Sequence, residues 1–171
     1  MTRILGIDPG LQRTGWGVID SRGNALAFVA CGVVATNPSH AMAERLVTLH
    51  RGIGEIITRH HPDDAAVEET FLNRNPLSSL KLGHARGALL TTLSLAGLAI
   101  TEYAATKVKK SVVGVGRAEK QQVGHMVRIL LPGSAGFADA ADAADALAVA
   151  ICHAHHMGIR KVAGVQSSEF S

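Results

Sequence analysis

The chain alternates between short apolar runs and longer segments whose apolar residues recur at helical spacing. Three runs come first and predict strands over residues 3–8, 14–20 and 25–35. From about residue 40 to 60, Leu46, Leu49 and Ile53 follow one another at intervals of three and four, which predicts an amphipathic helix. The rest of the chain predicts strand 65–68, helix 75–96, strand 98–103 and helices 105–110, 118–131 and 138–156.

This order of elements predicts a single α/β domain. The first three strands form a leading meander, and crossovers through helices reach the other two, so we expect a five-stranded mixed sheet with helices on both faces. A length of 171 residues allows one well-buried core and is short for two domains. We expect the domain to occupy residues 1–157, and residues 158–171 to form a flexible C-terminal tail.

Composition narrows the class of protein. Hydrophobic residues make up 47% and charged residues 18%, as in globular rather than disordered chains. No apolar run approaches the roughly 20 residues that a membrane-spanning helix needs. The two cysteines, Cys31 and Cys152, stand in apolar surroundings with no partner spacing. We therefore expect a cytoplasmic protein that does not associate with a membrane.

Charge is unevenly distributed along the chain. The net charge is +3, but residues 70–130 contain nine basic residues against the two acids Glu102 and Glu119, a local balance of +7. The basic residues are Arg74, Lys81, Arg86, Lys107, Lys109, Lys110, Arg117, Lys120 and Arg128. A solvated basic face is one interpretation. A polyanionic partner is the other, and so acid-poor a segment favours it.

Two carboxylates stand at the ends of apolar strands. Asp8 ends the first strand and Glu68 ends the fourth. A lone buried carboxylate is unfavourable unless it is paired or bound to a metal. If these strands are parallel neighbours, both side chains emerge at the carboxyl edge of the sheet, where open α/β folds place their sites. Asp8 could instead begin an Asp-Pro-Gly turn.

The last helix adds Asp139, Asp142 and Asp145 at intervals of three in an alanine-rich run. Asp139 follows a Gly/Pro break and is interpreted as a helix N-cap. Asp142 and Asp145 lie one turn apart, where like charges repel mildly and a divalent cation would compensate them. A site with carboxylate oxygens alone suits Mg²⁺ or Mn²⁺, and two such ions can hydrolyse a phosphodiester.

Several motifs in this sequence resemble those of the RuvC family of Holliday-junction resolvases. In order they are Ile4-Leu-Gly-Ile-Asp-Pro-Gly10 with Thr14-Gly-Trp-Gly-Val18, Val67-Glu-Glu-Thr-Phe71 with Asn73-Arg-Asn75, Leu80-Lys-Leu-Gly-His-Ala-Arg-Gly87, Val108-Lys-Lys-Ser-Val-Val-Gly114 with Ala118-Glu-Lys120, and Asp142-Ala-Ala-Asp-Ala-Leu-Ala-Val-Ala150. The resemblance runs from Arg3 to about His155, nearly the whole chain.

The resemblance implies an RNase H-like fold and a homodimeric endonuclease that nicks four-way DNA junctions symmetrically and leaves ligatable ends. It also implies the RuvA–RuvB branch-migration complex as a partner. It assigns both the catalytic role and the binding of two Mg²⁺ per site, with Mn²⁺ able to substitute, to Asp8, Glu68, Asp142 and Asp145. Asp139 and Asp142 form an alternative pair, but the Ala-Leu-Ala-Val-Ala that follows Asp145 favours the later one.

The resemblance also points to DNA contacts. Lys109 and Lys120 fall on the family's functional lysines, which suits phosphate binding near the scissile bond. Phe71 stacks on an unpaired junction base or belongs to the core, and the residues leave both interpretations open. Part of the helix from Leu77 to Ala96 is expected at the dimer interface. The further basic residues expected on DNA are Arg74, Lys81, Arg86, Lys110 and Arg117.

Three other functions are alternatives to this one. The Gly6-to-Gly10 segment also resembles the phosphate loop of actin-like ATPases, but those need a second lobe for which this chain has no room. A related nuclease acting on RNA–DNA hybrids or single strands would carry the same four acids. A DNA-binding module without catalysis would have no reason to point carboxylates at phosphates, so the acids favour an enzyme.

Overall fold

A five-stranded mixed sheet organises the fold. The structure is a computed structural model that describes residues 1–69, 75–136 and 140–166, with side chains described through residue 157. The strands are β1 (Thr2–Asp8), β2 (Arg13–Arg22), β3 (Ala25–Ala35), β4 (Asp64–Glu69) and β5 (Ala99–Ala104). Their order across the sheet is β3-β2-β1-β4-β5.

Strand directions follow from the connections. β1, β2 and β3 form an antiparallel meander, because tight turns join them. β4 is parallel to β1 and β5 is parallel to β4, because a helix crosses over before each. This arrangement confirms the mixed sheet predicted from the sequence.

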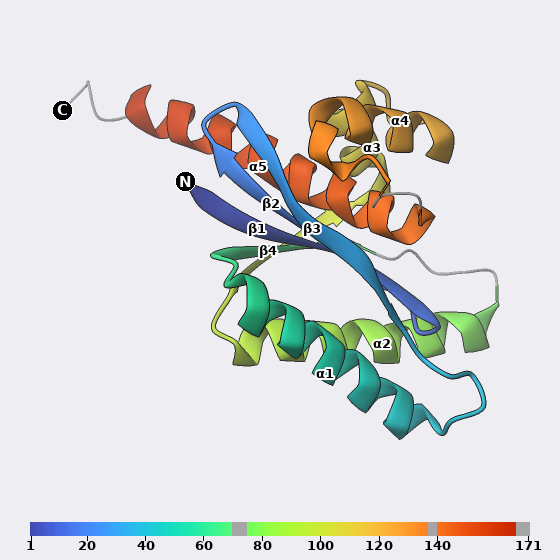
Figure 1. The fold of residues 1–171 in the computed structure, drawn as a ribbon. Coiled ribbons are helices and arrows are strands. Elements are labelled where there is room, and N and C mark those ends of the chain that lie inside the picture. Colours follow the sequence, from blue (N-terminus) through green and yellow to red (C-terminus); the bar gives the residue numbers. More distant parts are fainter. Residues whose placement is uncertain (70–74, 137–139, 167–171) are drawn as a thin grey trace.

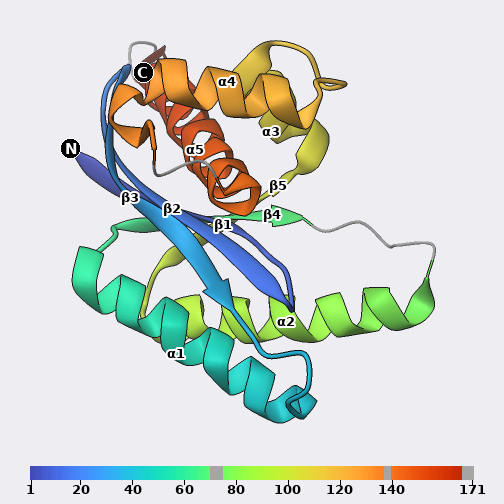
Figure 2. The same cartoon turned by 45° about the vertical axis from the view of Figure 1, so that its right-hand side comes forward.

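Helices cover both faces of this sheet, as Figures 1 and 2 show. The crossover helices α1 (Met42–His60) and α2 (Pro76–Leu95) lie together on one face. The other face carries α5 (Ala141–Gln166), with α3 (Ala105–Val113) and α4 (Lys120–Leu130) packed against it and the short 3-10 helix η1 (Pro132–Ser134) beside β3. None of the helices in the described ranges is long and apolar enough to cross a membrane.

Side-chain alternation along β1 divides the core between the two faces. Leu5 and Ile7 belong to the hydrophobic cluster formed with α1 and α2. Ile4 belongs to the cluster formed with α5, and Gly6 points the same way. Because alternation continues to the strand's end, Asp8 faces α5 as well.

Glycines on β1 and β2 let α5 approach the sheet closely. A β-carbon at Gly6 would overlap the carbonyl oxygen of Ala146, and one at Gly15 would overlap the carbonyl oxygen of Asp142. Gly17, paired with Gly6 across the two strands, has no side chain on this face either. The backbone of α5 therefore rests directly on this part of the sheet.

The last helix differs from the prediction. We expected it to run from about residue 138 to His156; it begins at Ala141 and continues to Gln166. His153 therefore lies inside the helix, where it is buried and its Nδ1 lies 2.9 Å from the Tyr103 hydroxyl. The boundary between domain and tail at residue 157 stays a prediction.

Substituting Gly6 tests the close approach of α5. We expect Gly6→Ala to lower the free energy of unfolding by about 1–3 kcal/mol, the usual effect of overpacking, because the neighbours are backbone atoms that cannot rotate away. Gly54→Ala in α1 is the control: nothing lies within 4 Å of the added carbon, and it should stabilise by about 0.4–1 kcal/mol. Urea unfolding measures both, and equal effects would contradict the tight contact.

Candidate active site

Asp8 and Glu68 lie side by side at the carboxyl edge of the sheet. β1 and β4 are parallel with Ile7 opposite Val67, so the residue that follows each is also adjacent. Ala66 on β4 belongs to the cluster on the α5 side, and alternation gives Glu68 the same direction. The structure thus brings the two strand-end carboxylates together beneath α5.

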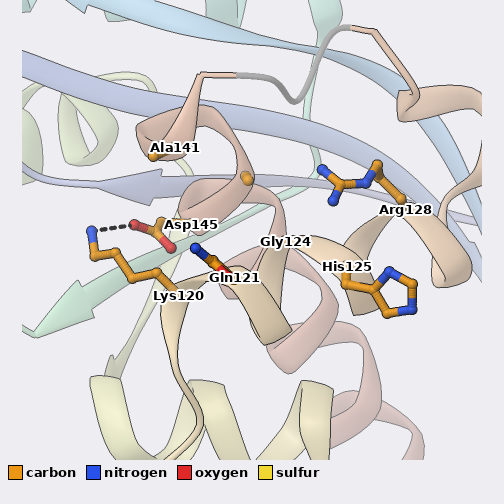
Figure 3. A pocket seen from close by; sticks show the side chains of 8 residues that line it. Lys120, Gln121, Gly124, His125, Arg128, Ala141 and Asp145 are labelled. Carbon is orange, nitrogen blue, oxygen red and sulfur yellow. Dashed lines mark hydrogen bonds and ion pairs between the residues drawn. The ribbon is translucent and has the colours of Figure 1, made fainter.

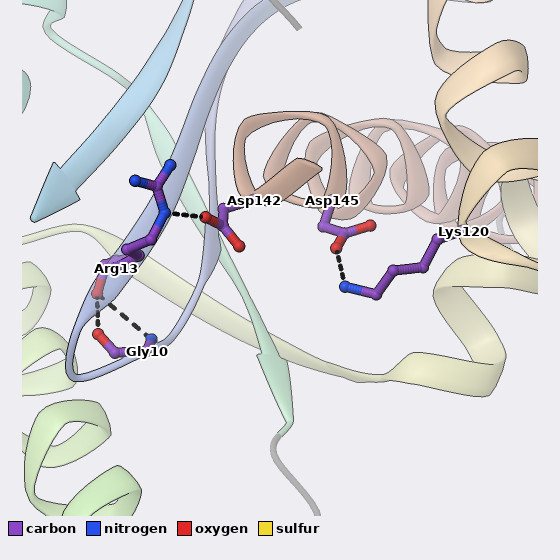
Figure 4. Close-up of polar contacts among 6 residues, drawn as sticks. Gly10, Arg13, Lys120, Asp142 and Asp145 are labelled. Carbon is purple, nitrogen blue, oxygen red and sulfur yellow. Dashed lines mark hydrogen bonds and ion pairs between the residues drawn. The ribbon is translucent and has the colours of Figure 1, made fainter. Parts of the chain in front are cut away.

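The turn after β1 holds Asp8 in place. The buried Thr14 donates its hydroxyl to the carbonyl oxygen of Gly10 at 2.6 Å and accepts from the Gly10 N–H at 3.4 Å (Figure 4). Asp8 also pairs across the hairpin with Gly15, the glycine beneath Asp142. The first turn of α5 therefore lies directly beside the end of β1.

That first part of α5 presents Asp142 and Asp145, and each is paired with a cation from another element. Arg13 Nε donates to Asp142 Oδ2 at 2.6 Å, and Lys120 Nζ donates to Asp145 Oδ2 at 2.9 Å (Figure 4). The mild repulsion expected between these aspartates is thus offset by basic side chains from β2 and α4.

A cavity of about 160 Å³ collects most of these groups. Its polar lining consists of Asp8, Glu68, Asp145, Lys109 and Lys120. The remaining wall is aliphatic and comes from Ala105, Val108, Val123 and Ala148. Asp142 does not line the cavity, but its charge acts on Asp8 from the border. Two expected lysines and three expected acids therefore share one small pocket.

Burial and like charges raise the pKa values of the strand-end acids. Burial is the largest cause for Asp8, whose pKa rises to about 7, and Glu68 and Asp145 add to it. Burial, and then Asp145, also raise the pKa of Glu68, while Lys120 and Lys109 oppose the rise. The site thus carries more negative charge than its two ammonium groups neutralise.

Lys120 is held in its charged form. Its hydrogen bond to Asp145 raises its pKa above the ordinary value for lysine, and the charges of Asp8 and Asp142 add to this. An ammonium kept protonated binds anions and is a poor general base. Lys120 is therefore suited to hold a phosphate oxygen.

The donor chemistry fits a hard divalent cation. All four acids offer carboxylate oxygens, the ligands that Mg²⁺ and Mn²⁺ prefer, and their charge is not fully offset. Among the described residues no three His, Cys, Asp or Glu side chains are close enough together to hold an ion. Two of the four acids already have a cationic partner, since Arg13 bonds one oxygen of Asp142 and Lys120 bonds one oxygen of Asp145.

Of the other basic residues expected on DNA, Lys81, Arg86, Lys110 and Arg117 are described by the structure, and none of them lines the cavity. Phe71, Arg74 and Asp139 lie outside the described residues. Lys81, Lys110 and Arg117 are exposed on the surface. Arg86 forms an ion pair with Glu102.

Sequence reasoning missed Arg13. It follows the Asp-Pro-Gly turn closely, yet nothing in the local pattern shows that its guanidinium reaches Asp142, 129 positions later. Only the packing of α5 on β1 and β2 brings the two together.

Comparison with known proteins identifies the family of this fold and site. The family model described as crossover junction endodeoxyribonuclease RuvC matches residues 4–153. The chain belongs to the RuvC family. It is 61% identical to the crossover junction endodeoxyribonuclease RuvC of Paramagnetospirillum magneticum, over 93% of this chain and 95% of that protein. The RuvC of Azorhizobium caulinodans is 56% identical over 92% of both chains.

Solved structures agree with this placement in the RuvC family. Thermus thermophilus RuvC in complex with a Holliday junction substrate superposes with a TM-score of 0.86 at 33% identity, over 94% of this chain and 97% of that one. The yeast mitochondrial Holliday junction resolvase Ydc2 superposes with a TM-score of 0.69 at 11% identity, which shows a shared fold alone. The RNase H-like fold predicted from the sequence is confirmed.

The raised pKa of Asp8 predicts a pH-dependent stability in the absence of metal. The folded chain binds this proton more tightly than an unfolded chain with a pKa of 3.8, so ionisation destabilises the fold as the pH rises from about 4 to about 7. Asp8→Asn removes this ionisation. The increase in the free energy of unfolding caused by the substitution should therefore be larger at pH 8 than at pH 4, by on the order of a few kcal/mol. Urea unfolding in EDTA measures the difference, and an increment independent of pH would contradict it.

Proposed function

We propose that this RuvC-family chain resolves four-way DNA junctions by metal-dependent, symmetric hydrolysis of two phosphodiester bonds, leaving nicks that a ligase can seal. The observation that supports it best is the cavity in which Asp8, Glu68 and Asp145 meet Lys109 and Lys120. Carboxylates suit the metal and ammonium groups suit the phosphate, and the hydrolysis of a phosphodiester needs both.

In this proposal Asp8, Glu68, Asp142 and Asp145 hold two Mg²⁺ ions, and Mn²⁺ can substitute. Ions bound there supply an activated water and stabilise the leaving oxygen of the displacement. Arg13 and Lys120 neutralise Asp142 and Asp145 in the structure. Both side chains can turn toward DNA phosphates once the carboxylates have another counter-ion.

Lys109 and Lys120 are the proposed contacts to the scissile phosphate, since both line the cavity. The exposed Lys81, Lys110 and Arg117 would contact the junction arms further away. The same role is proposed for Arg74 and for Arg86, which would have to leave Glu102. Phe71 is proposed to stack on an unpaired base, an interaction worth roughly 1–3 kcal/mol.

The proposed homodimer uses the outer face of α2. Leu77, Leu80 and Leu95 expose 67%, 57% and 77% of their surface, which is unusual for leucines on a helix of twenty residues. A two-fold dimer would match the two-fold symmetry of a junction and so explain paired cuts. The RuvA–RuvB complex as partner and the cytoplasmic location are also proposed, from the family resemblance and the free cysteines.

Cleavage of a synthetic junction tests the proposed function. The protein is incubated with a labelled four-way junction and Mg²⁺, beside linear duplex and RNA–DNA hybrid. We expect paired symmetric nicks on the junction alone, and loss of cleavage by at least about a hundredfold in EDTA and in Asp8→Asn, because the metal site is lost.

Two results would contradict this function. Binding without cleavage over several core sequences, in Mg²⁺ and in Mn²⁺ alike, would leave a structure-specific binding protein. Preferred cleavage of the RNA–DNA hybrid would favour a related nuclease, because the four acids alone do not distinguish these substrates.

A charge on the exposed face of α2 tests the dimer. Leu80→Glu should shift the protein to monomer in sedimentation and reduce symmetric paired cutting, since a buried interface disfavours an unpaired charge. Val47→Glu on α1, where Val47 is 44% exposed, is the matched control and should remain dimeric. Unchanged sedimentation for both variants would place the interface elsewhere.

A further inference from the structure

A groove of about 500 Å³ lies beside the active-site cavity, between α4 and the start of α5. Figure 3 shows Lys120 at one end of it, bonded to Asp145, and Arg128 at the other. Lys120 and Asp145 line both the groove and the cavity, so the two spaces adjoin. Whatever polymer occupies the cavity can therefore continue into the groove.

The face of α4 that lines this groove carries hydrogen-bond donors. Lys120, Gln121, His125 and Arg128 all present N–H groups, and Arg128 and Lys120 are cations. The opposite face of α4 is buried through Val123 and Val127 and anchors the helix in the core. A face of donors on a fixed helix suits an anionic ligand that only accepts hydrogen bonds, as phosphate does.

The donors are spread along the helix over a length suited to a polymer. α4 begins at Lys120, and a rise of about 1.5 Å per residue puts Arg128 about 12 Å further along. One strand of duplex DNA rises about 3.4 Å per phosphate, so this length corresponds to three or four nucleotides. Arg128 is also turned back along the helix, because a β-carbon at Gly124 would lie 3.9 Å from its Nη1.

Within the described part of the chain, Arg128 and His125 form no ion pair, and the groove's one carboxylate, on Asp145, is bonded to Lys120. The cationic end around Arg128 thus has no internal counter-ion among those residues. We propose that this groove binds the sugar-phosphate backbone of the cleaved strand next to the scissile phosphate, with Arg128 and His125 as phosphate contacts. The inference rests on the proposed function, since it presupposes DNA in the cavity.

Binding of a fluorescent four-way junction in EDTA tests the groove. Arg128→Ala should bind about tenfold more weakly at 50 mM salt, the usual loss for one charge-assisted contact. The logarithm of the binding constant falls linearly with the logarithm of the salt concentration, and losing one phosphate contact reduces this slope by about 0.9. The ratio of the Arg128→Ala dissociation constant to that of wild type should therefore shrink about 3.5-fold between 50 and 200 mM salt. His125→Ala should weaken binding less, and Arg128→Lys should retain part of the affinity because it keeps the charge.

Arg51→Ala is the matched control, because Arg51 is exposed on α1 at the other face of the sheet. It should bind as wild type does, and melting curves should show that every variant is folded.

Neutral methylphosphonates locate the contact along the strand. A methylphosphonate placed within about four nucleotides of the scissile phosphate should lower the junction affinity of wild type. The same substitution should not lower the affinity of Arg128→Ala any further, because the contact is already lost. Two results would overturn the proposed role of the groove even if the wild-type protein cleaves the junction. One is that the affinity losses from the methylphosphonate and from Arg128→Ala add up at every position tested. The other is that Arg128→Ala binds the junction with the affinity and the salt dependence of wild type. Absence of cleavage by wild type would instead overturn the proposed function itself.

Discussion

The contact between the backbone of α5 and the glycines of β1 and β2 is the constraint on which the site depends. Gly6 and Gly15 leave no space for a β-carbon, so the helix lies at the shortest distance the sheet allows. Asp8, opposite Gly15 in the hairpin, consequently meets the first turns of α5, which carry Asp142 and Asp145. A larger residue at either glycine would move the two aspartates away from the strand ends.

Gathering four carboxylates in this way has an electrostatic consequence. Burial and mutual repulsion raise the pKa of Asp8 to about 7, and the structure offsets part of the negative charge with Lys120 and Arg13. A chain that only needed stability would replace such a cluster with apolar side chains. The unfavourable charge is explained if the site serves to attract cations. Once cations neutralise the carboxylates, Lys120 and Arg13 become available to DNA.

The sequence predicted the sheet, its helices and the two strand-end acids, because period-two and helical patterns are local and because a strand end next to a turn is visible in the residues. Lys109 and Lys120 came from the family resemblance. Arg13 was missed because its partner is distant along the chain. The local sequence does not distinguish Arg128 from a solvated basic residue, because the groove that it lines forms only when α4 packs beside α5. The predicted end of α5 at His156 was wrong, because Gly158 does not interrupt the helix, which continues to Gln166.

Calorimetric titration of the DNA-free protein with Mn²⁺ at pH 7, in buffers of different ionisation enthalpy, tests the cation site most directly. If Asp8 and its neighbours bind the ion, a carboxyl with a pKa of about 7 is partly protonated beforehand and must release its proton. The account predicts saturable binding with a fraction of a proton released per chain, and a smaller release in Asp8→Asn. Binding that is identical in wild type and Asp8→Asn, with no proton released, would contradict it.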